Sequence, residues 1–422
     1  MGAVFALIDA NNFYVSCEQV FDPKLVGRPV IILSNNDGCV ISRSPEARRL
    51  GIRMGAPLFE IEQLIHAHNV QVYSSNYALY GDMSQRLMAV LQEFTPEVEI
   101  YSIDEAFINL VGIRSESHQA LGRIIQERVY KHTCVPVTVG IGETKTLAKV
   151  ANHIAKKSER AAGVLDLTRS RFQEEALRRT PVEEVWGIGP AYSKLLRERG
   201  INTALELREV DTGWARKMMT VTGARIVMEL RGVSCLPLEV CPRPRKSVSV
   251  TRSFPVAIEN LDEIREAVAV FTSRAAEKLR HDQLAASAIT VFVETSRFVE
   301  GPQHHADSAT LELLYPSDNT QELLQQALEA LGRIFRRGFE YRRAGVLLSG
   351  LVPAGELTRR LFDCETLEKY RRVMPVVDQL NAKYGRGTVR FAVARPGGRW
   401  KTKALRSSPH YTTRLTDIPL LQ

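Results

Sequence analysis

The chain has 422 residues, of which 44% are hydrophobic and 25% charged, so it is long enough for several globular domains. Its 56 Lys and Arg residues outnumber its 48 Asp and Glu residues, and the net charge of +8 favours a polyanionic partner such as nucleic acid. A stretch of roughly 18 apolar residues, which a transmembrane helix needs, is absent, and the six cysteines form no C-x-x-C pair. We therefore expect a soluble cytoplasmic protein with reduced thiols.

The first 170 residues alternate strand and helix signals, which is typical of an α/β or α+β layer. Short apolar runs predict buried strands at residues 4–8 and 30–33. Turn residues fill positions 34–38, and a short helix is expected at 46–50. The remaining elements predicted in this part are a hairpin at 98–110, a strand at 135–141, a helix at 145–157 and a strand at 163–167.

The character of the sequence changes after about residue 170. Residues 170–235 read as helical, and residues 241–246 form a linker with two prolines and three cations. Residues 247–350 return to mixed structure, with strands expected at 247–254 and 288–295 and helices at 261–279 and 321–335. The tail beyond residue 352 has weaker signals and ends in a basic stretch.

Three acidic residues carry the first functional signal. Asp9 ends the first predicted strand, and Asp104 and Glu105 lie at the predicted hairpin turn. Adjacent carboxylates stay ionised at neutral pH and repel one another, so they need solvent or a cation. If the two strands are neighbours, the three acids converge into an oxygen-only site of the kind that suits Mg²⁺, where two ions can clamp a phosphoryl displacement. The alternatives are a structural strand-end Asp and a solvated acidic turn.

Cationic residues that could hold phosphate accompany these acids. There is no G-x-x-x-x-G-K-[ST] segment, which excludes a P-loop. The helix predicted at 145–157 carries Lys145, Lys149 and Lys156 on one face. A solvated helix face is the alternative interpretation. Arg48, on the short helix at 46–50, is a second cationic candidate.

A third signal lies in the helical part of the chain. The sequence Trp-Gly-Ile-Gly at 186–189 separates two helical stretches, which is the helix-hairpin-helix pattern. Glycines there let the backbone approach a phosphate closely and donate N–H groups to it, without reading base sequence. An ordinary helical turn is the alternative.

Several segments, taken together, resemble the Y-family DNA polymerases, and within them the UmuC type, the catalytic subunit of bacterial DNA polymerase V. The most specific segments are ALIDANNFY at 6–14, LSNNDGCV at 33–40, YSIDEAF at 101–107 and KTLAK at 145–149. The tail matches as well, at 381–383, 385–388 and 408–414. The resemblance covers nearly the whole chain, from Phe5 to about Thr413.

The resemblance implies roles for individual residues. Two Mg²⁺ ions would be bound by the catalytic acids and by a backbone carbonyl, which correspond to Asp9, Asp104, Glu105 and Ala10. Substrate-binding roles, including a steric gate against ribonucleotides at Tyr14 and triphosphate contacts at Arg48 and Lys156, are implied for Phe13, Tyr14, Arg48 and Lys156. DNA would be bound by Gly187, Ile188, Gly189 and Lys194. The chain departs from the family pattern at Pro45, where many relatives carry a triphosphate-binding Tyr.

The implied fold is a multidomain α+β right hand. Its parts are a palm at 1–33 and 79–170, fingers at 34–78, a helical thumb at 171–240, a little finger at 243–350 and a UmuC-type C-terminal region at 351–422. Polymerase chemistry does not require that last region, which is expected to dock accessory partners.

The implied function is error-prone translesion DNA synthesis in the SOS response, in the bacterial cytoplasm at the nucleoid. Implied partners are primer-template DNA, dNTPs, the cleaved UmuD dimer and the RecA nucleoprotein filament. A sliding-clamp peptide is weakly matched at 358–362, which keeps Leu361 and Phe362 but lacks the family's Gln and first Leu. Two other classes stay open: a non-catalytic DNA-binding scaffold with a retained polymerase fold, and a nucleotide cyclase, which would need neither the hairpin at 187–189 nor a basic domain after residue 243.

Overall fold

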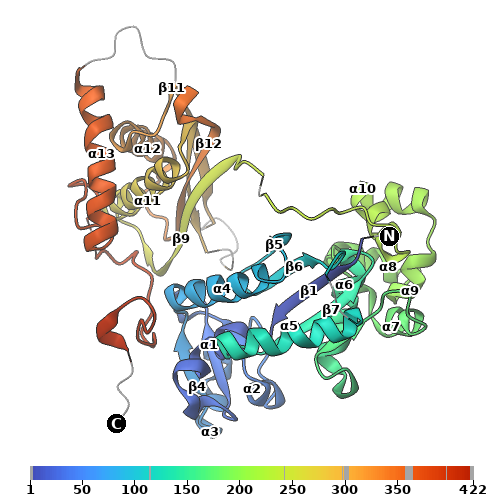
Figure 1. The fold of residues 1–422 in the computed structure, drawn as a ribbon. Helices are drawn as coiled ribbons and strands as arrows, with labels where there is room; N and C mark the ends of the chain where they lie inside the picture. The colour runs from blue at the N-terminus through green and yellow to red at the C-terminus, as the bar shows by residue number, and fades with distance from the viewer. Residues whose placement is uncertain are drawn as a thin grey trace. The chain divides into compact units, whose positions relative to one another are not determined.

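The structure is a computed structural model that describes residues 3–113, 116–241, 243–296, 298, 304–356, 365–395 and 397–418. The chain divides into two compact units. The first contains residues 1–34, 38–242 and 406–422, and the second contains 35–37 and 243–405. Elements of both units are labelled in Figure 1.

A five-stranded sheet organises the first unit, with the strand order β5-β6-β1-β7-β8. The central strand β1 is antiparallel to both of its neighbours. It is buried along its whole length, which explains why it reads as a continuous apolar run. The strands are β1 Phe5–Ala10, β5 Val98–Ile100, β6 Glu105–Asn109, β7 Val137–Gly142 and β8 Val164–Asp166.

Helices cover both faces of this sheet (Figure 1). Alternate β1 residues Ala6 and Ile8 join a core with α1, α4 and α5, whereas Leu7 faces the opposite way and packs with Ala148 of α6. The helices are α1 Phe13–Phe21, α4 Tyr77–Gln92, α5 His118–Thr133 and α6 Lys145–Lys157. A second, three-stranded sheet of order β3-β2-β4 has its own core with two helices. Its elements are β2 Val30–Leu33, β3 Val40–Arg43, α2 Pro45–Arg49, α3 Leu58–Ala67 and β4 Gln71–Ser74.

The rest of the first unit is helical, and the second unit is a sheet covered by helices. The helical part contains α7 Gln173–Arg179, α8 Pro190–Arg197, α9 Ala204–Glu209 and α10 Thr212–Leu230. The second unit has the strand order β11-β10-β12-β9. Its elements are β9 Ser247–Ile258, α11 Leu261–His281, β10 Leu284–Thr295, β11 Ala306–Ser317, α12 Thr320–Ile334, β12 Tyr341–Pro353 and α13 Glu365–Tyr384. Short 3-10 turns occur at Pro23–Leu25, Asn35–Asp37, Glu159–Ala161, Val182–Glu184, Ala354–Glu356 and Leu415–Asp417.

The elements predicted from the sequence are confirmed, and the helix at 145–157 has the predicted bounds. Several elements were not predicted: strands β3, β4, β11 and β12 and helices α1, α3, α4, α5 and α13. The multidomain α+β fold class is confirmed. Residues 406–418 pack with the first unit.

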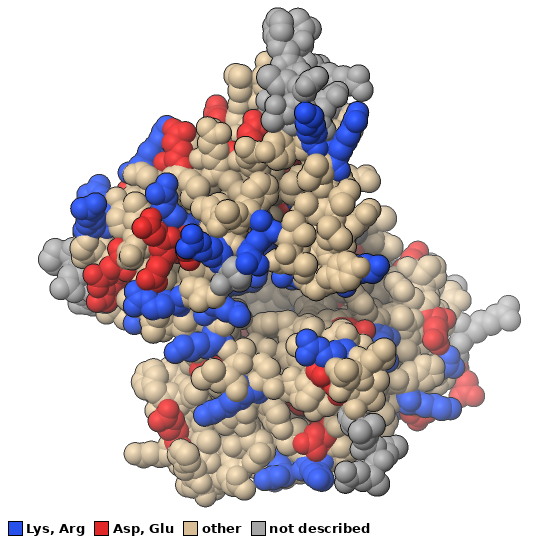
Figure 2. Space-filling view, turned by 90° about the vertical axis from the view of Figure 1, so that its left-hand side faces the viewer, with Lys and Arg blue, Asp and Glu red and all other residues tan. Residues whose placement is uncertain are grey.

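Charge on the surface is mixed. Figure 2 shows Lys and Arg side chains interspersed with Asp and Glu on the face that it draws. Ion pairs such as Arg280 with Asp378 (2.6 Å) and Arg399 with Glu263 (3.0 Å) neutralise part of the basic excess. None of the helices within the described ranges is both long enough and apolar enough to span a bilayer.

A close approach between β7 and α6 makes Gly140 sensitive to substitution. A Cβ atom there would lie 2.2 Å from the backbone nitrogen of Asn152 and 2.3 Å from the carbonyl oxygen of Ala148. We expect Gly140→Ala to lower the free energy of unfolding by about 1–3 kcal/mol or more, because it pushes α6 off the sheet. Gly81→Ala is the matched control, since nothing lies within 4 Å of its Cβ position in α4. We expect Gly81→Ala to raise the free energy of unfolding, measured by chemical denaturation, by up to about 1 kcal/mol. Equal effects of the two substitutions would contradict the tight β7–α6 contact.

Candidate active site

Two carboxylates face each other across the central strand pair. In the antiparallel register of β1 and β6, Asp9 lies directly opposite Glu105. Asp104 precedes β6 in the turn from β5, and its carbonyl accepts a hydrogen bond from the Ala10 N–H (2.9 Å). The hairpin predicted at 98–110, with its acids at the turn, is thus confirmed, and its second strand is the neighbour of β1.

Helix α6 brings two lysines to these acids. Lys156 Nζ lies 2.6 Å from Asp9 Oδ2, and Lys149 Nζ lies 2.8 Å from Glu105 Oε2. Lys145, on the same helix face, is buried and pairs with Glu99. The alternative of a solvated lysine face is therefore wrong, because this face of α6 packs against the acidic edge of the sheet.

Burial and the lysines shift the protonation of the acid pair in opposite directions. Burial raises the pKa of Asp9 to about 7, although Lys156 pulls it down, and Glu105 raises it further through its charge and a side-chain hydrogen bond. Burial alone would also raise the pKa of Glu105, but the hydrogen bond and charge of Lys149 outweigh it, so this pKa is lowered. The pair thus divides into one carboxyl that keeps its proton readily and one that loses it readily.

The acids are held by lysines and a hydroxyl in this arrangement. Ser102 Oγ donates to Asp104 Oδ1 (2.5 Å), while Lys156 and Lys149 hold Asp9 and Glu105. Accordingly, across the described part of the chain, no three His, Cys, Asp or Glu side chains are grouped so as to hold a metal ion as they stand. The donor set nevertheless fits Mg²⁺, since it consists of carboxylate and carbonyl oxygens only. Binding an ion would require the lysines to release the carboxylates.

One cavity of about 440 Å³ collects these acids with most of the other predicted site residues. Its walls come from β1, α1, β3, α2, the β5–β6 turn and α6. The lining residues are Asp9, Ala10, Asn12, Phe13, Tyr14, Ile41, Ser42, Arg43, Arg48, Met54, Asp104, Glu105 and Lys156.

The two aromatic residues at the start of α1 differ in environment. Tyr14 is half-buried, and its ring stacks on that of Tyr80, with centroids 4.5 Å apart and planes 17° apart. The ring of Tyr77 meets it edge-on at 6.2 Å. Phe13 is buried in the core, so core packing is its main observed role.

A guanidinium that sequence reasoning missed lies beside Arg48. Arg43, on β3, lines the same cavity, and its Nη1 donates to the carbonyl of Ile52. Burial and the charge of Arg48 lower the pKa of Arg43. Strand alternation offered a signal, because Ile41 and Arg43 share the less buried face of β3. Two adjacent arginines suit a polyphosphate better than one.

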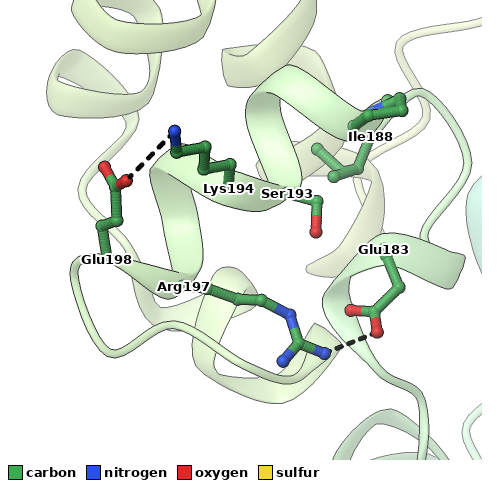
Figure 3. Close-up of a pocket in the computed structure, with 8 residues that line it drawn as sticks. Glu183, Ile188, Ser193, Lys194, Arg197 and Glu198 are labelled. Carbon is green, nitrogen blue, oxygen red and sulfur yellow. Dashed lines mark hydrogen bonds and ion pairs between the residues drawn. The ribbon is translucent and has the colours of Figure 1, made fainter.

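Ile188, Gly189 and Lys194 line a separate cavity of about 580 Å³ (Figure 3), whereas Gly187 is not among its lining residues. Ile188 points into the helical core, and Gly187 has φ +91° with only 2.8 Å between its Cβ position and Ile226. Gly189 precedes α8 and has open space around it. Lys194 lies 4.0 Å from Glu198, and both side chains are exposed. An exposed pair of this kind is weak, so a phosphate can replace Glu198 as the partner of Lys194.

Comparison with known proteins agrees with this geometry. The chain matches the impB/mucB/samB family at residues 8–153, the C-terminal domain of that family at 245–361 and the domain of unknown function DUF4113 at 371–421. It is 44% identical to UmuC of Salmonella typhimurium over 418 residues, which is 98% of this chain and 99% of that protein. It is 39% identical to MucB of Escherichia coli over 99% of both chains. It is 26% identical to DNA polymerase IV 1 of Bacillus subtilis over 94% of both chains.

Solved structures share the fold. A chimera of the Y-family DNA polymerases Dbh and Dpo4 matches with a TM-score of 0.67 and 23% identity, covering 83% of this chain and 99% of that one. DinB from Sulfolobus solfataricus matches with a TM-score of 0.51 and 21% identity, covering 82% and 98%.

Together with the shared fold, the relatives over nearly the whole chain make this protein a DNA-directed DNA polymerase of the Y family. Within that class the chain belongs to the impB/mucB/samB family and is of the UmuC type. Polymerases of this class perform translesion synthesis on DNA from nucleotide substrates, and they generally depend on divalent metal ions.

The raised pKa of Asp9 predicts how stability depends on pH in metal-free protein. A carboxyl with a raised folded-state pKa stabilises fully below its unfolded pKa of 3.8, and this contribution is lost as the pH rises through about 7. Asp9→Asn keeps the neutral form at every pH. We expect its Tm advantage over the wild type to grow between pH 4 and pH 8 by roughly 5 °C. Thermal unfolding in chelator, with Asp82→Asn as a control outside the cavity, measures this. A difference that does not vary with pH would contradict the burial of a readily protonated Asp9.

Proposed function

We propose that the cavity transfers nucleotidyl groups from dNTPs to a primer 3′-hydroxyl, including opposite damaged template, with two Mg²⁺ ions on Asp9, Asp104, Glu105 and the Ala10 carbonyl. The observation that carries this proposal is the single cavity that three acids share with Tyr14, Arg48 and Lys156. A non-catalytic scaffold is not favoured, because the chain is of the UmuC type and its three acids share one cavity with the other candidate site residues.

In this proposal the acidic residues of the cavity bind the metal ions, and the basic residues bind the triphosphate. When bound, the ions would stabilise negative charge on the attacking and leaving oxygens of the phosphoryl displacement. Asp9 and Glu105 would exchange their lysine partners for the ions. Lys156, released from Asp9, is then free to pair with the triphosphate. Arg48, together with Arg43, offers planar donors that match phosphate oxygens.

The ring of Tyr14 would serve as the gate against ribonucleotides. It lines the cavity and is backed by Tyr80, so it cannot move away easily from a nucleotide sugar. A 2′-hydroxyl directed at it would collide with it. Phe13 would support the start of α1 from the core.

DNA binding is proposed for the helical part of the first unit. Gly187, Ile188 and Gly189 would bring backbone N–H groups to a phosphate, with Lys194 adding charge. Such contacts read the phosphate backbone and weaken as salt rises.

The five-part division into palm, fingers, thumb, little finger and C-terminal region remains our proposal for how these roles are distributed. So do the role in the SOS response, the nucleoid location, and the partners UmuD (as the cleaved dimer) and RecA (as the nucleoprotein filament). They are supported by membership of the UmuC type. The segment 358–362 that weakly matches a clamp-binding peptide lies outside the described residues, and clamp binding rests on its sequence alone.

Removal of either turn acid should separate catalysis from DNA binding. We expect Asp104→Asn and Glu105→Gln each to reduce primer extension to less than a few per cent, with primer-template affinity largely intact, because metal ligation stabilises charge in the transition state. Primer extension in Mg²⁺ and a fluorescence-anisotropy binding assay measure both quantities. Glu93→Gln, at an acid outside the cavity, is the control and should retain activity. Substantial extension by either turn-acid variant would exclude the metal assignment.

Shortening Tyr14 should relax sugar discrimination. We expect Tyr14→Ala to raise ribonucleotide relative to deoxyribonucleotide incorporation by orders of magnitude, because the collision with the 2′-hydroxyl disappears. Tyr14→Phe keeps the ring and should discriminate like the wild type. Steady-state kcat/KM for matched ATP and dATP gives the ratio. If folded Tyr14→Ala protein discriminates normally, Tyr14 is a packing residue only.

A further inference from the structure

The end of the chain returns to the first unit as an extra edge of its small sheet. The Ser74 N–H donates to the Arg406 carbonyl (3.0 Å), and the Arg406 N–H donates to Ser74 Oγ (2.9 Å). Ser74, the last residue of β4, forms a parallel bridge with Ser407. Farther along, the ring of Tyr411 stacks on that of Phe21, with centroids 4.8 Å apart and planes only 6° apart. Residues 406–411, hereafter the C-terminal strap, are therefore a specific packing element.

Ser408 is the buried centre of the C-terminal strap. Its hydroxyl donates to Glu18 Oε1 (3.0 Å) and accepts from Asn76 Nδ2 (2.9 Å). The Asn76 amide also donates to the carbonyls of Ser408 and Pro409 (3.3 and 3.1 Å). Its oxygen accepts from the Leu79 N–H and so caps helix α4. The C-terminal strap is thereby bonded to the first turn of α4, the helix that carries Tyr80.

Glu18 connects the C-terminal strap to Tyr80. Glu18 is only 2% exposed, and its Oε1 accepts from the Tyr80 hydroxyl (2.7 Å) as well as from Ser408. Burial raises the pKa of Glu18, and the two hydroxyl donors oppose that rise. Since a buried acceptor is costly to leave unsatisfied, Ser408 and Tyr80 both help to fix the Glu18 carboxyl.

The last step leads to the cavity. Tyr80 is fully buried, and its ring lies stacked on Tyr14, as described above. With its hydroxyl bonded to Glu18 at one end and its backbone in α4 at the other, Tyr80 has little freedom to tilt. Tyr14 rests on it and faces the cavity.

We propose that Ser408 is a positioning residue for Tyr14, acting through Glu18 and Tyr80, so that the C-terminal strap sets how strictly the polymerase excludes ribonucleotides. This inference rests on the proposed function of Tyr14 as the gate. A steric gate works only while its ring is held in place, and the stacked Tyr80 is what holds it. The C-terminal strap is thus part of the machinery for sugar selection, although it lies more than 390 residues from Tyr14 in sequence.

The test compares Ser408→Ala with Ser407→Ala in the full-length chain. Ser407 is the matched control, because it is exposed and adjacent. We expect Ser408→Ala to raise the ribonucleotide-to-deoxyribonucleotide ratio of kcat/KM by roughly tenfold, the effect of about one hydrogen bond, with kcat for dNTPs within about twofold of the wild type. Tyr80→Phe, which keeps the stack and loses the bond to Glu18, should act in the same direction. The double variant Ser408→Ala/Tyr80→Phe should show the same ratio as either single variant, since both substitutions break the same series of contacts to Tyr14.

A second measurement reports directly on the environment of the Tyr14 ring. In protein labelled with fluorotyrosine, the ¹⁹F signal of Tyr14, assigned by its loss in Tyr14→Phe, should shift or broaden in Ser408→Ala but not in Ser407→Ala. An unchanged signal with unchanged discrimination overturns the positioning role. A fall in thermal stability and kcat without a change in discrimination also overturns it, because that pattern marks a purely structural contact. If the signal moves while Tyr14→Ala discriminates normally, the gate proposal fails and the physical coupling stands.

Discussion

The structure depends on two carboxylates that the β1–β6 register holds opposite each other in a largely buried position. Like charges directly opposite on a sheet destabilise it, and burial increases the cost. The chain meets this cost locally with Lys156 and Lys149 from one helix, seven residues apart. That requirement fixes how α6 must lie on the sheet. It also explains why Gly140 has no side chain, since the helix could otherwise not come close enough.

The lysines explain how the proposed metal site can be stable before a metal ion binds. An ammonium group satisfies a carboxylate electrostatically, yet it is monovalent and lies on a flexible stem, so a divalent ion can replace it. Lys156 is better suited to leave than Lys149, because its side chain is 39% exposed against 18%. Lys149 also lies 4.6 Å from the centre of the Tyr101 ring, which holds it in place. The more mobile cation is thus the one beside the carboxyl that keeps its proton more readily.

The sequence revealed those features whose signal lies within a short segment of the chain, and it missed those that only the fold brings together. The strand ending in Asp9, the hairpin bearing Asp104 and Glu105, and the lysine spacing on α6 are each readable within a few turns or strands. Arg43 was missed because strand alternation marks only its face of β3, and only the fold brings it beside Arg48. Strand β11 was missed because the exposed apolar residues Leu314 and Tyr315 break its alternation. Strand β12 was missed because its residues 344–346 are buried in succession. The long-range contacts of the C-terminal strap have no sequence period at all, since Ser408 and Glu18 are 390 positions apart.

The two buried carboxylates on either side of Tyr14 are satisfied by different chemistry, and this difference matches their roles. Asp9 is held by an ammonium group that can be exchanged for another cation, as a site that binds charged substrates requires. Glu18 accepts hydrogen bonds from two hydroxyl groups, which are directional donors without charge. Helix α1 carries Glu18 one turn beyond Tyr14, so the same helix joins the exchangeable side to the fixed side. Tyr14, the proposed gate, lies on this helix and is backed by the buried ring of Tyr80. The C-terminal strap therefore packs directly on the first helix through Ser408 and Tyr411.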